Sequence, residues 1–199
     1  GFYQNYSEDW MRGATNDKAI VYQSRLTWVA AQAAMRYPAQ AEVYKADARH
    51  GLDFLANQMT DKQDGGLFWG LGDKGVPVRG GEKHAYGISF AIYAACGEYQ
   101  ATHDAKALDF AKRAYLWLDA HAHDAKNGGY YEALTRTGKP ILTITDAAQP
   151  SDEIGTRYGF KTMNTHIHLL ESLSALYQVW PNAGLRARLE EMFALIRDK

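Results

Sequence analysis

Apolar residues recur at intervals of three or four through most of this chain, and they do so in two kinds of segment. Segments of the first kind, residues 41–59, 105–121 and 183–197, carry an apolar stripe beside a charged one. This pattern predicts amphipathic helices with one face on a core and the other in solvent. In the middle segment the apolar stripe consists of Leu108, Ala111, Tyr115 and Leu118.

Segments of the second kind are rich in alanine and apolar almost all the way round. Residues 28–35 and 90–96 are the clearest examples. A helix that lacks a polar face is buried on several sides, so we expect these helices to form an inner layer covered by the amphipathic ones. The single cysteine, Cys96, lies in such a segment and is expected to be a small buried residue rather than a nucleophile.

The two kinds of helix alternate within a unit that occurs three times, at about 1–60, 61–123 and 124–199. Each unit runs from a glycine–aromatic turn to a lysine that opens the inner helix, and then to the outer helix. We therefore predict one all-α domain of three helical hairpins, about half of a double-layered toroid, with small strands or hairpins at the rim. The turn glycines are Gly1, Gly66 and Gly129, and the lysines are Lys18, Lys83 and Lys161.

Residues three and seven positions after each lysine share one face of the inner helix. Because all inner helices start at the same rim, these positions are expected to face a common cavity. His168 and Arg25, at position seven, are the candidate catalytic residues, since a buried arginine must pair with or bind a polar group. Tyr86 and Asn164, at position three, are candidate substrate-binding residues. Aromatic faces with fixed hydrogen-bonding groups suit a sugar.

Other chemistries receive less support from the sequence. His166 and His168 are two residues apart, which splays their rings on a helix, so we expect no metal site and assign His166 either to support of the site or to structure. No phosphate-binding loop or serine elbow is present in the sequence. The remaining histidines are expected at the surface or as satisfied core residues: His50, His84, His103, His121 and His123.

The third unit contains an insertion of 15 residues between its turn glycine and its lysine. This insertion is acidic, and two facing carboxylates are what most glycoside hydrolases use. A glycoside hydrolase or lyase on the same toroid is therefore the alternative enzyme class, and a non-catalytic carbohydrate-binding half-barrel is a further alternative. The acidic residues concerned are Asp146, Asp152 and Glu153.

The composition limits the partners that we expect. Apolar residues make up 46% and charged residues 23% of the chain, with a net charge of −1, which is ordinary for a soluble globular protein. The near-neutral balance gives no electrostatic footprint for nucleic acid or an anionic membrane. No apolar run approaches the roughly 20 residues that a membrane span needs. We expect a cytoplasmic protein without nucleic-acid or membrane partners.

Several sequence strings, in this order along the chain, carry a family resemblance. With these strings the chain resembles the N-acylglucosamine 2-epimerase family, which includes cellobiose 2-epimerases and aldose–ketose isomerases acting on mannose. The last string looks most like cellobiose 2-epimerases. The strings are Gly1-Phe2-Tyr3, Ser24-Arg25-Leu-Thr-Trp28, Lys83-x-x-Tyr86-Gly-x-x-Phe90, Gly128-Gly129-Tyr-Tyr-Glu132 and Met163-Asn164-Thr-His166-Ile-His168-Leu-Leu-Glu171.

The resemblance implies an (α/α)6 barrel and a cofactor-free epimerisation at C2 of a reducing-end mono- or disaccharide. In this reaction the sugar ring opens, a histidine removes the C2 proton to give an enediol-type intermediate, and a second histidine returns it. The resemblance places Arg25, Tyr86, Asn164 and His168 at substrate-contacting positions, with His168 assisting ring opening or proton traffic.

The same resemblance implies that a full family member has twelve barrel helices, with both proton-shuttling histidines in its second half. We therefore expect these 199 residues to carry the binding half and to be inactive or barely active alone, unless a partner chain completes the ring. A half-barrel leaves the flanks of its inner helices exposed, so self-association into a homo-oligomer is a further expectation. Which sugar is used, and whether it is epimerised or isomerised, the sequence leaves open.

Overall fold

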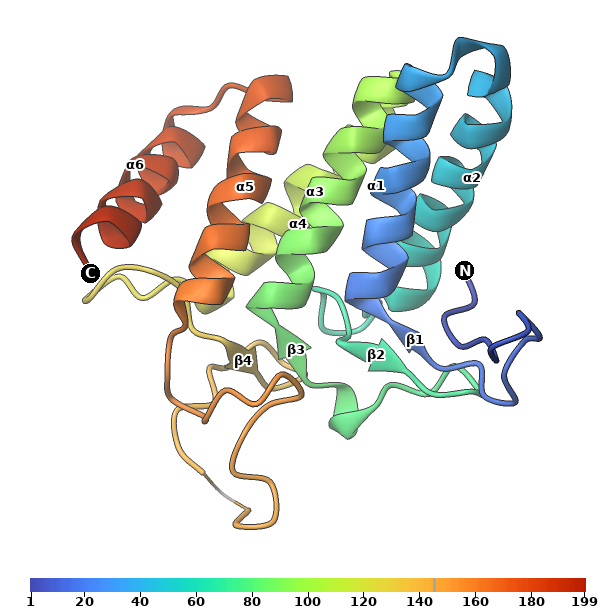
Figure 1. The fold of residues 1–199 in the computed structure, drawn as a ribbon. Coiled ribbons are helices and arrows are strands. Elements are labelled where there is room, and N and C mark those ends of the chain that lie inside the picture. Colours follow the sequence, from blue (N-terminus) through green and yellow to red (C-terminus); the bar gives the residue numbers. More distant parts are fainter. Residues whose placement is uncertain (145) are drawn as a thin grey trace.

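The computed structural model describes residues 1–144 and 146–199, and it is dominated by helical hairpins (Figure 1). A short π-helical turn, Leu55–Met59, extends the second helix. In the described residues the α-helices are α1 (Ile20–Arg36), α2 (Ala41–Phe54), α3 (Ala85–Thr102), α4 (Ala105–Ala122), α5 (Met163–Val179) and α6 (Ala183–Asp198).

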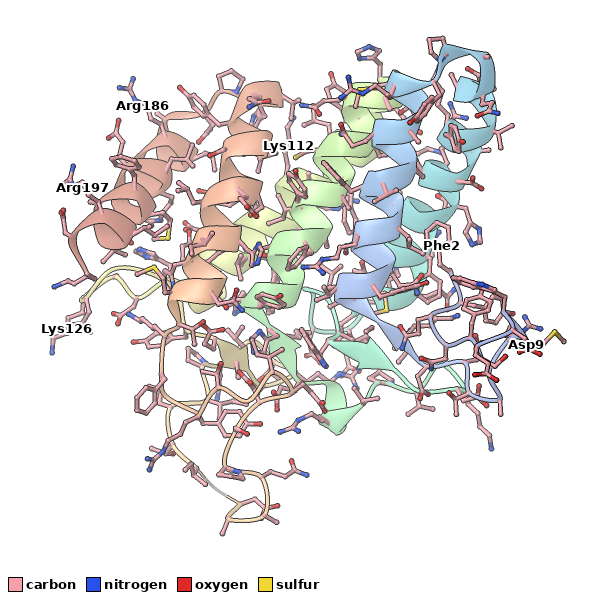
Figure 2. All side chains as sticks on the ribbon, viewed as in Figure 1. Phe2, Asp9, Lys112, Lys126, Arg186 and Arg197 are labelled. Atoms are coloured by element: carbon pink, nitrogen blue, oxygen red, sulfur yellow. The ribbon has the colours of Figure 1, made fainter. Side chains whose placement is uncertain are left out.

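The helices form two layers, as predicted. Helices α1, α3 and α5 lie side by side in the inner layer, and each packs against the outer helix that follows it in the chain, α2, α4 or α6 (Figure 1). Side chains fill the space between the layers, whereas Arg186 and Arg197 on α6 point away from the molecule (Figure 2). None of the helices described in the structure is long and apolar enough to cross a membrane.

The inner helices differ in how far they are buried. Helix α3 packs against α1 on one side and α5 on the other, and 12 of its 18 residues are buried. The prediction that residues 28–35 are also buried on several sides is wrong, because Val29 is 51% and Met35 44% exposed. Helix α1 packs against α2 and α3 but has no further inner helix beside it in the described structure, so its alanine-rich surface stays partly open.

Short strands lie at the rim, as predicted; they join consecutive units, and single bridges such as Leu71 with Pro77 also close turns within a unit. Strand β1 (Lys18–Ala19) pairs antiparallel with β2 (Gly70–Leu71), and β3 (Lys83–His84) pairs with β4 (Ala133–Leu134). Lys18 and Lys83 therefore open strands, and all three lysines lie two residues before an inner helix begins and not at the first helical residue. The N-termini of α1 and α3 are thus held by the next unit along the chain, whereas that of α5 is held by Glu132 of its own unit.

The repeated lysines hold the glycine turns. The Nζ atom of Lys83 donates to Oδ2 of Asp61 at 3.2 Å, and Oδ1 of Asp61 accepts from the backbone N–H groups of Gln63 and Asp64. Both charged side chains are buried, at 0% and 1% exposure. An ion pair taken out of water is stable only when its remaining hydrogen bonds are satisfied, and here they are.

The third unit repeats this arrangement. Lys161 Nζ donates to Asp124 Oδ2 at 2.7 Å and to the carbonyl of Gly128 at 2.6 Å. These hydrogen bonds from Lys161 and from Asn127 hold the pKa of Asp124 well below its ordinary value. In the first unit Lys18 donates to the carbonyl of Phe2 at 2.7 Å. The lysine is therefore a structural residue in all three units.

Candidate functional site on the inner helices

The structure brings three of the four predicted site residues together on the inner face. The Arg25 guanidinium on α1 lies 4.8 Å from the ring centroid of Phe90 on α3. The Phe90 ring lies 4.6 Å from the ring of His168 on α5, and Tyr86 contacts the same histidine edge-on at 5.3 Å. A continuous strip of one cation, two aromatic rings and one imidazole therefore crosses all three inner helices.

Phe90 is the centre of this strip. Its ring also contacts Tyr86, at 5.0 Å between centroids, and it is only 8% exposed. Helix α3 is packed on both sides, and this packing fixes the position of the Phe90 ring. Phe90 occupies the same register position as Arg25 and His168 in the sequence. A search for polar residues alone does not find it, because its role is to provide a rigid apolar surface between the two.

Arg25 differs from its prediction, because its side chain is exposed rather than buried. The reason is the open side of α1, which no other described helix covers. The Arg25 guanidinium makes a cation–π contact with Phe90, and among the described residues it forms no salt bridge. The guanidinium donors are thus available to a ligand oxygen.

His168 is bound on one edge. Its Nδ1 atom lies 2.8 Å from Oε2 of Glu171, one turn further along α5. Glu171 is not among the residues predicted for the site, although an acid three residues after a histidine on the same helix face is a signal that the sequence contains. The corresponding positions of the other two units hold Trp28 and Tyr93, whose rings stack at 5.2 Å.

These aromatic residues form a hollow beside the strip. It has a volume of about 260 Å³ and lies between α1 and α3. The rings of Trp28 and Phe90 and the Arg25 side chain are among its walls. An aromatic hollow with one cationic group can take an apolar ring face whose edges carry hydroxyls.

Asn164 lies on the exposed first turn of α5, one turn before His168. Among the described residues no hydrogen bond to its amide is formed, so both its donor and its acceptor face solvent. Its assignment as a substrate-binding residue stays a prediction, as do the roles of the other three candidates.

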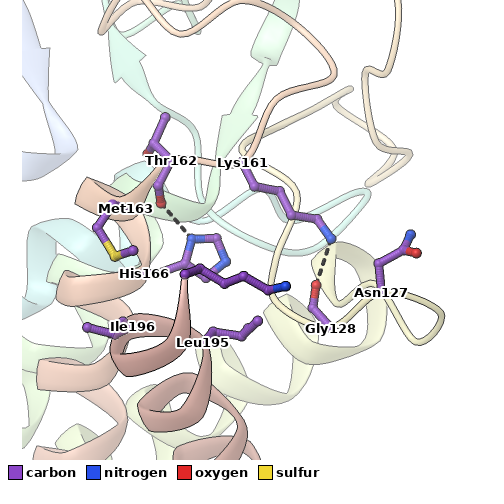
Figure 3. A pocket seen from close by; sticks show the side chains of 9 residues that line it. Asn127, Gly128, Lys161, Thr162, Met163, His166, Leu195 and Ile196 are labelled. Carbon is purple, nitrogen blue, oxygen red and sulfur yellow. Dashed lines mark hydrogen bonds between the residues drawn. The ribbon is translucent and has the colours of Figure 1, made fainter.

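His166 is a structural residue. It is 6% exposed, its Nδ1 lies 2.6 Å from the Thr162 carbonyl, and its Nε2 accepts the backbone N–H of Tyr130 at 3.0 Å. Both ring nitrogens are therefore in use. This ring borders a cavity of about 380 Å³ between the start of α5 and the end of α6 (Figure 3). Lys161, on the same wall, is likewise committed, to Gly128.

His84 anchors the acidic insertion. Its Nε2 lies 2.6 Å from Oδ2 of Asp152, both side chains are 1% exposed, and its Nδ1 accepts the backbone N–H of Tyr86 at 3.2 Å. The prediction of a satisfied core histidine holds for His84, but the sequence gives no sign of a partner 68 residues away. The insertion is thereby fixed directly beside the first turn of α3.

The next acid of the insertion is also engaged in binding the rim. Arg79 contacts Glu153 at 3.3 Å and donates to the hydroxyl of Tyr158 at 2.8 Å, and Tyr158 donates to Glu82 at 2.7 Å. The two neighbouring acids Asp152 and Glu153 are therefore loop anchors, not carboxylates facing one another across a substrate cleft. Asp146 accepts from the backbone N–H of Ala148 in a local turn.

Three ionisable groups, those of His84, Glu132 and Asp152, lie within 4.8 Å of one another, close enough to be compared with a metal site. Their atoms already have partners. Glu132 Oε1 accepts from the backbone N–H and hydroxyl of Thr162, and its Oε2 accepts from the hydroxyl of Thr165. Glu132 thus caps the N-terminus of α5, where negative charge is favourable. The cluster fits a structural role.

The chain is similar in sequence to known sugar epimerases. The family model for N-acylglucosamine 2-epimerase matches residues 1–199. The chain is 34% identical over 183 residues to a cellobiose 2-epimerase of Bacteroides fragilis, covering 92% of this chain and 44% of the relative. It is 31% identical to one from Ruminococcus albus, covering 100% and 48%. The chain spans about half the length of these relatives.

The chain also resembles about half of several solved structures. The cellobiose 2-epimerase from Spirochaeta thermophila superposes with a TM-score of 0.84 at 31% identity, covering 100% of this chain and 47% of that one. A D-mannose isomerase structure superposes at 0.78 with 23% identity, covering 98% and 45%. A family 76 mannosidase of Bacteroides thetaiotaomicron, at 0.68 and 15%, shares the fold alone, over 92% of this chain and 45% of that one. The predicted half of an (α/α)6 barrel is confirmed.

Proposed function

The chain belongs to the N-acylglucosamine 2-epimerase family, and from this premise we propose that its inner face is one wall of a sugar 2-epimerase or isomerase site. The substrate is a mono- or disaccharide that reacts at C2 of its reducing-end unit, without a cofactor. The observation that carries the proposal is the strip formed by Arg25, Phe90, Tyr86 and His168.

The chemistry needs the groups of this strip. Once the sugar ring is open, the C2 proton is acidified by the neighbouring carbonyl and can be removed by an imidazole, which titrates near neutrality and serves as base and then as acid. An enediol-type oxygen develops negative charge, which the exposed guanidinium of Arg25 can stabilise. His168 assists ring opening or proton traffic, and Tyr86 and Asn164 hydrogen-bond the sugar hydroxyls.

We propose that catalysis needs both this wall and residues that are not among these 199. The curated relatives that the chain matches are about twice as long. We therefore expect the chain alone to bind sugar through the strip and to exchange the C2 proton slowly or not at all, unless a second chain faces it.

The first experiment measures binding. Isotope-labelled chain is titrated with mannose, glucose, cellobiose and N-acetylmannosamine, and the resonances of the strip are followed. We expect at least one sugar to shift them and His168→Ala to weaken its binding about 10-fold or more, the loss of about one hydrogen bond to a charged or polar group. His50→Ala, an exposed histidine on α2, is the matched control and should bind as the unaltered chain does.

The second experiment identifies the reaction. The same sugars are incubated in D2O, and deuterium at C2 is measured by mass spectrometry. Deuterium that depends on His168 supports epimerase or isomerase chemistry. If the chain instead cleaves a polysaccharide, and if changes of Asp or Glu abolish cleavage while His168→Ala does not, the proposal is wrong and the hydrolase alternative replaces it. Binding of sugar without exchange by the chain alone agrees with the proposal. If exchange is absent even when a second chain that completes the ring faces this wall, the carbohydrate-binding alternative is favoured.

A further inference from the structure

Glu171 holds His168 from one side. Its Oε2 lies 2.8 Å from Nδ1 of the imidazole, and both residues are on the inner face of α5. We propose that Glu171 is a positioning residue, which binds the ring through Nδ1 so that Nε2 is the nitrogen presented to the substrate. The proposal rests on the proposed function in one respect only, namely that the substrate is a sugar.

The number of protons on the imidazole decides which nitrogen is free to accept. A neutral imidazole carries one N–H, and an ionised carboxylate can only accept. The hydrogen bond to Glu171 therefore places the proton on Nδ1 and leaves a lone pair on Nε2. In the described part of the chain no group is hydrogen-bonded to Nε2. Nε2 of neutral His168 is thus an acceptor, suited to a sugar hydroxyl that donates.

Comparison of the three units supports a specific role for this acid. Ten positions after the lysine, the first two units hold Trp28 and Tyr93, which stack on one another. The third unit holds Glu171 there, and it is the unit that has a histidine at position seven. Burial and the negative charge of Glu171 raise the pKa of Tyr93. The carboxylate therefore faces α3 across the inner surface.

The test reads the tautomer directly. Chain labelled with nitrogen-15 in histidine is examined without sugar by two-bond proton–nitrogen spectra, in mildly alkaline solution where an ordinary imidazole is neutral. We expect His168 to carry its proton on Nδ1. Glu171→Leu should convert it to a mixture of both tautomers, whereas Glu171→Gln, whose amide oxygen can still accept from Nδ1 although its NH2 group can also donate there, should keep a larger Nδ1-protonated fraction than Glu171→Leu does.

Two other histidines are controls in the same spectrum. His166 is expected to be protonated on Nδ1, which faces the Thr162 carbonyl, and His84 on Nε2, which faces Asp152. Neither should change in the Glu171 variants. Unchanged signals from both also show that the variants are folded.

The proposal is overturned if His168 is protonated on Nε2 in the unaltered chain, or if Glu171→Leu leaves its tautomer as it was. Glu171, at 55% side-chain exposure, would then be an ordinary solvated partner. A second readout is sugar affinity, which Glu171→Leu should lower about 10-fold while Glu171→Gln stays close to the unaltered chain. A chain that binds no sugar refutes the proposed function, and the tautomer result still decides the role of Glu171.

Discussion

The rim turns and the inner strip treat their polar groups in opposite ways. At the rim, the charges of Lys83 and Asp61 are buried and hydrogen-bonded to each other and to neighbouring backbone groups. On the inner face, the guanidinium of Arg25 and the amide of Asn164 have no hydrogen-bond partner in the part of the chain that the structure describes. The charged residue that repeats, the lysine, therefore stabilises the fold, whereas Arg25, a charged residue found in one unit only, remains available for binding.

The sharpest way to break this comparison is to remove the buried lysine. Lys83→Met leaves Asp61 with a buried charge that has lost one partner, and breaking such a pair costs about 3–5 kcal/mol. We expect a loss of that size in urea unfolding. Arg136 still contacts Asp61, so the lower end of the range is expected. Lys106→Met, on the exposed face of α4, is the control and should change stability by less than about 0.5 kcal/mol.

A smaller effect is expected from the turn glycine Gly129. A Cβ atom there would lie 2.6 Å from Nε2 of His166, and its φ of 74° is unfavourable for other residues. Gly129→Ala should cost about 2–3 kcal/mol from strain and overpacking together. Gly75 has the same φ of 74° and open space around its Cβ position, so Gly75→Ala isolates the strain and should cost about 1 kcal/mol. Equal losses of stability at both sites would show that the His166 side chain moves aside for the new Cβ atom without an energetic cost.

The smallest effect on stability is expected in the strip. Arg25 is exposed and holds no ion pair among the described residues, so Arg25→Ala should change the free energy of unfolding by less than about 0.5 kcal/mol. Its effect should be on sugar affinity instead, with a loss of about 10-fold or more. Arg186→Ala, on the outer face of α6, should alter neither quantity. A large loss of stability on removing Arg25 would mean that the strip is built like the rim.

The sequence predicts the layers because helical periodicity reports directly on which faces are buried. It also predicts the register that joins Arg25, Phe90 and His168, because three copies of one unit place equivalent residues at equivalent heights. It does not predict that Arg25 is exposed, since periodicity tells how apolar a helix is and not which of its sides has a neighbour.

Pairing over long distances accounts for the other differences. Strands of two residues carry no alternation, so nothing in the sequence links Lys18–Ala19 to Gly70–Leu71. The pairing of His84 with Asp152 is likewise not predictable, because the insertion that supplies the acid has no counterpart in the other units. Glu171 is a contrasting case, since its spacing from His168 is local and could have been found from the sequence.

The strand pairing between units has a consequence for the order in which the molecule is completed. The segment that precedes α1 finds its partner in residues 70–71, and the one that precedes α3 finds its partner in residues 133–134. During synthesis the start of an inner helix therefore waits for about 50 more residues before it is tied down. The sections of the binding wall on α1 and α3 are each set by the section made after them, so a defect in the second or third unit will be felt in the pocket residues of the unit before.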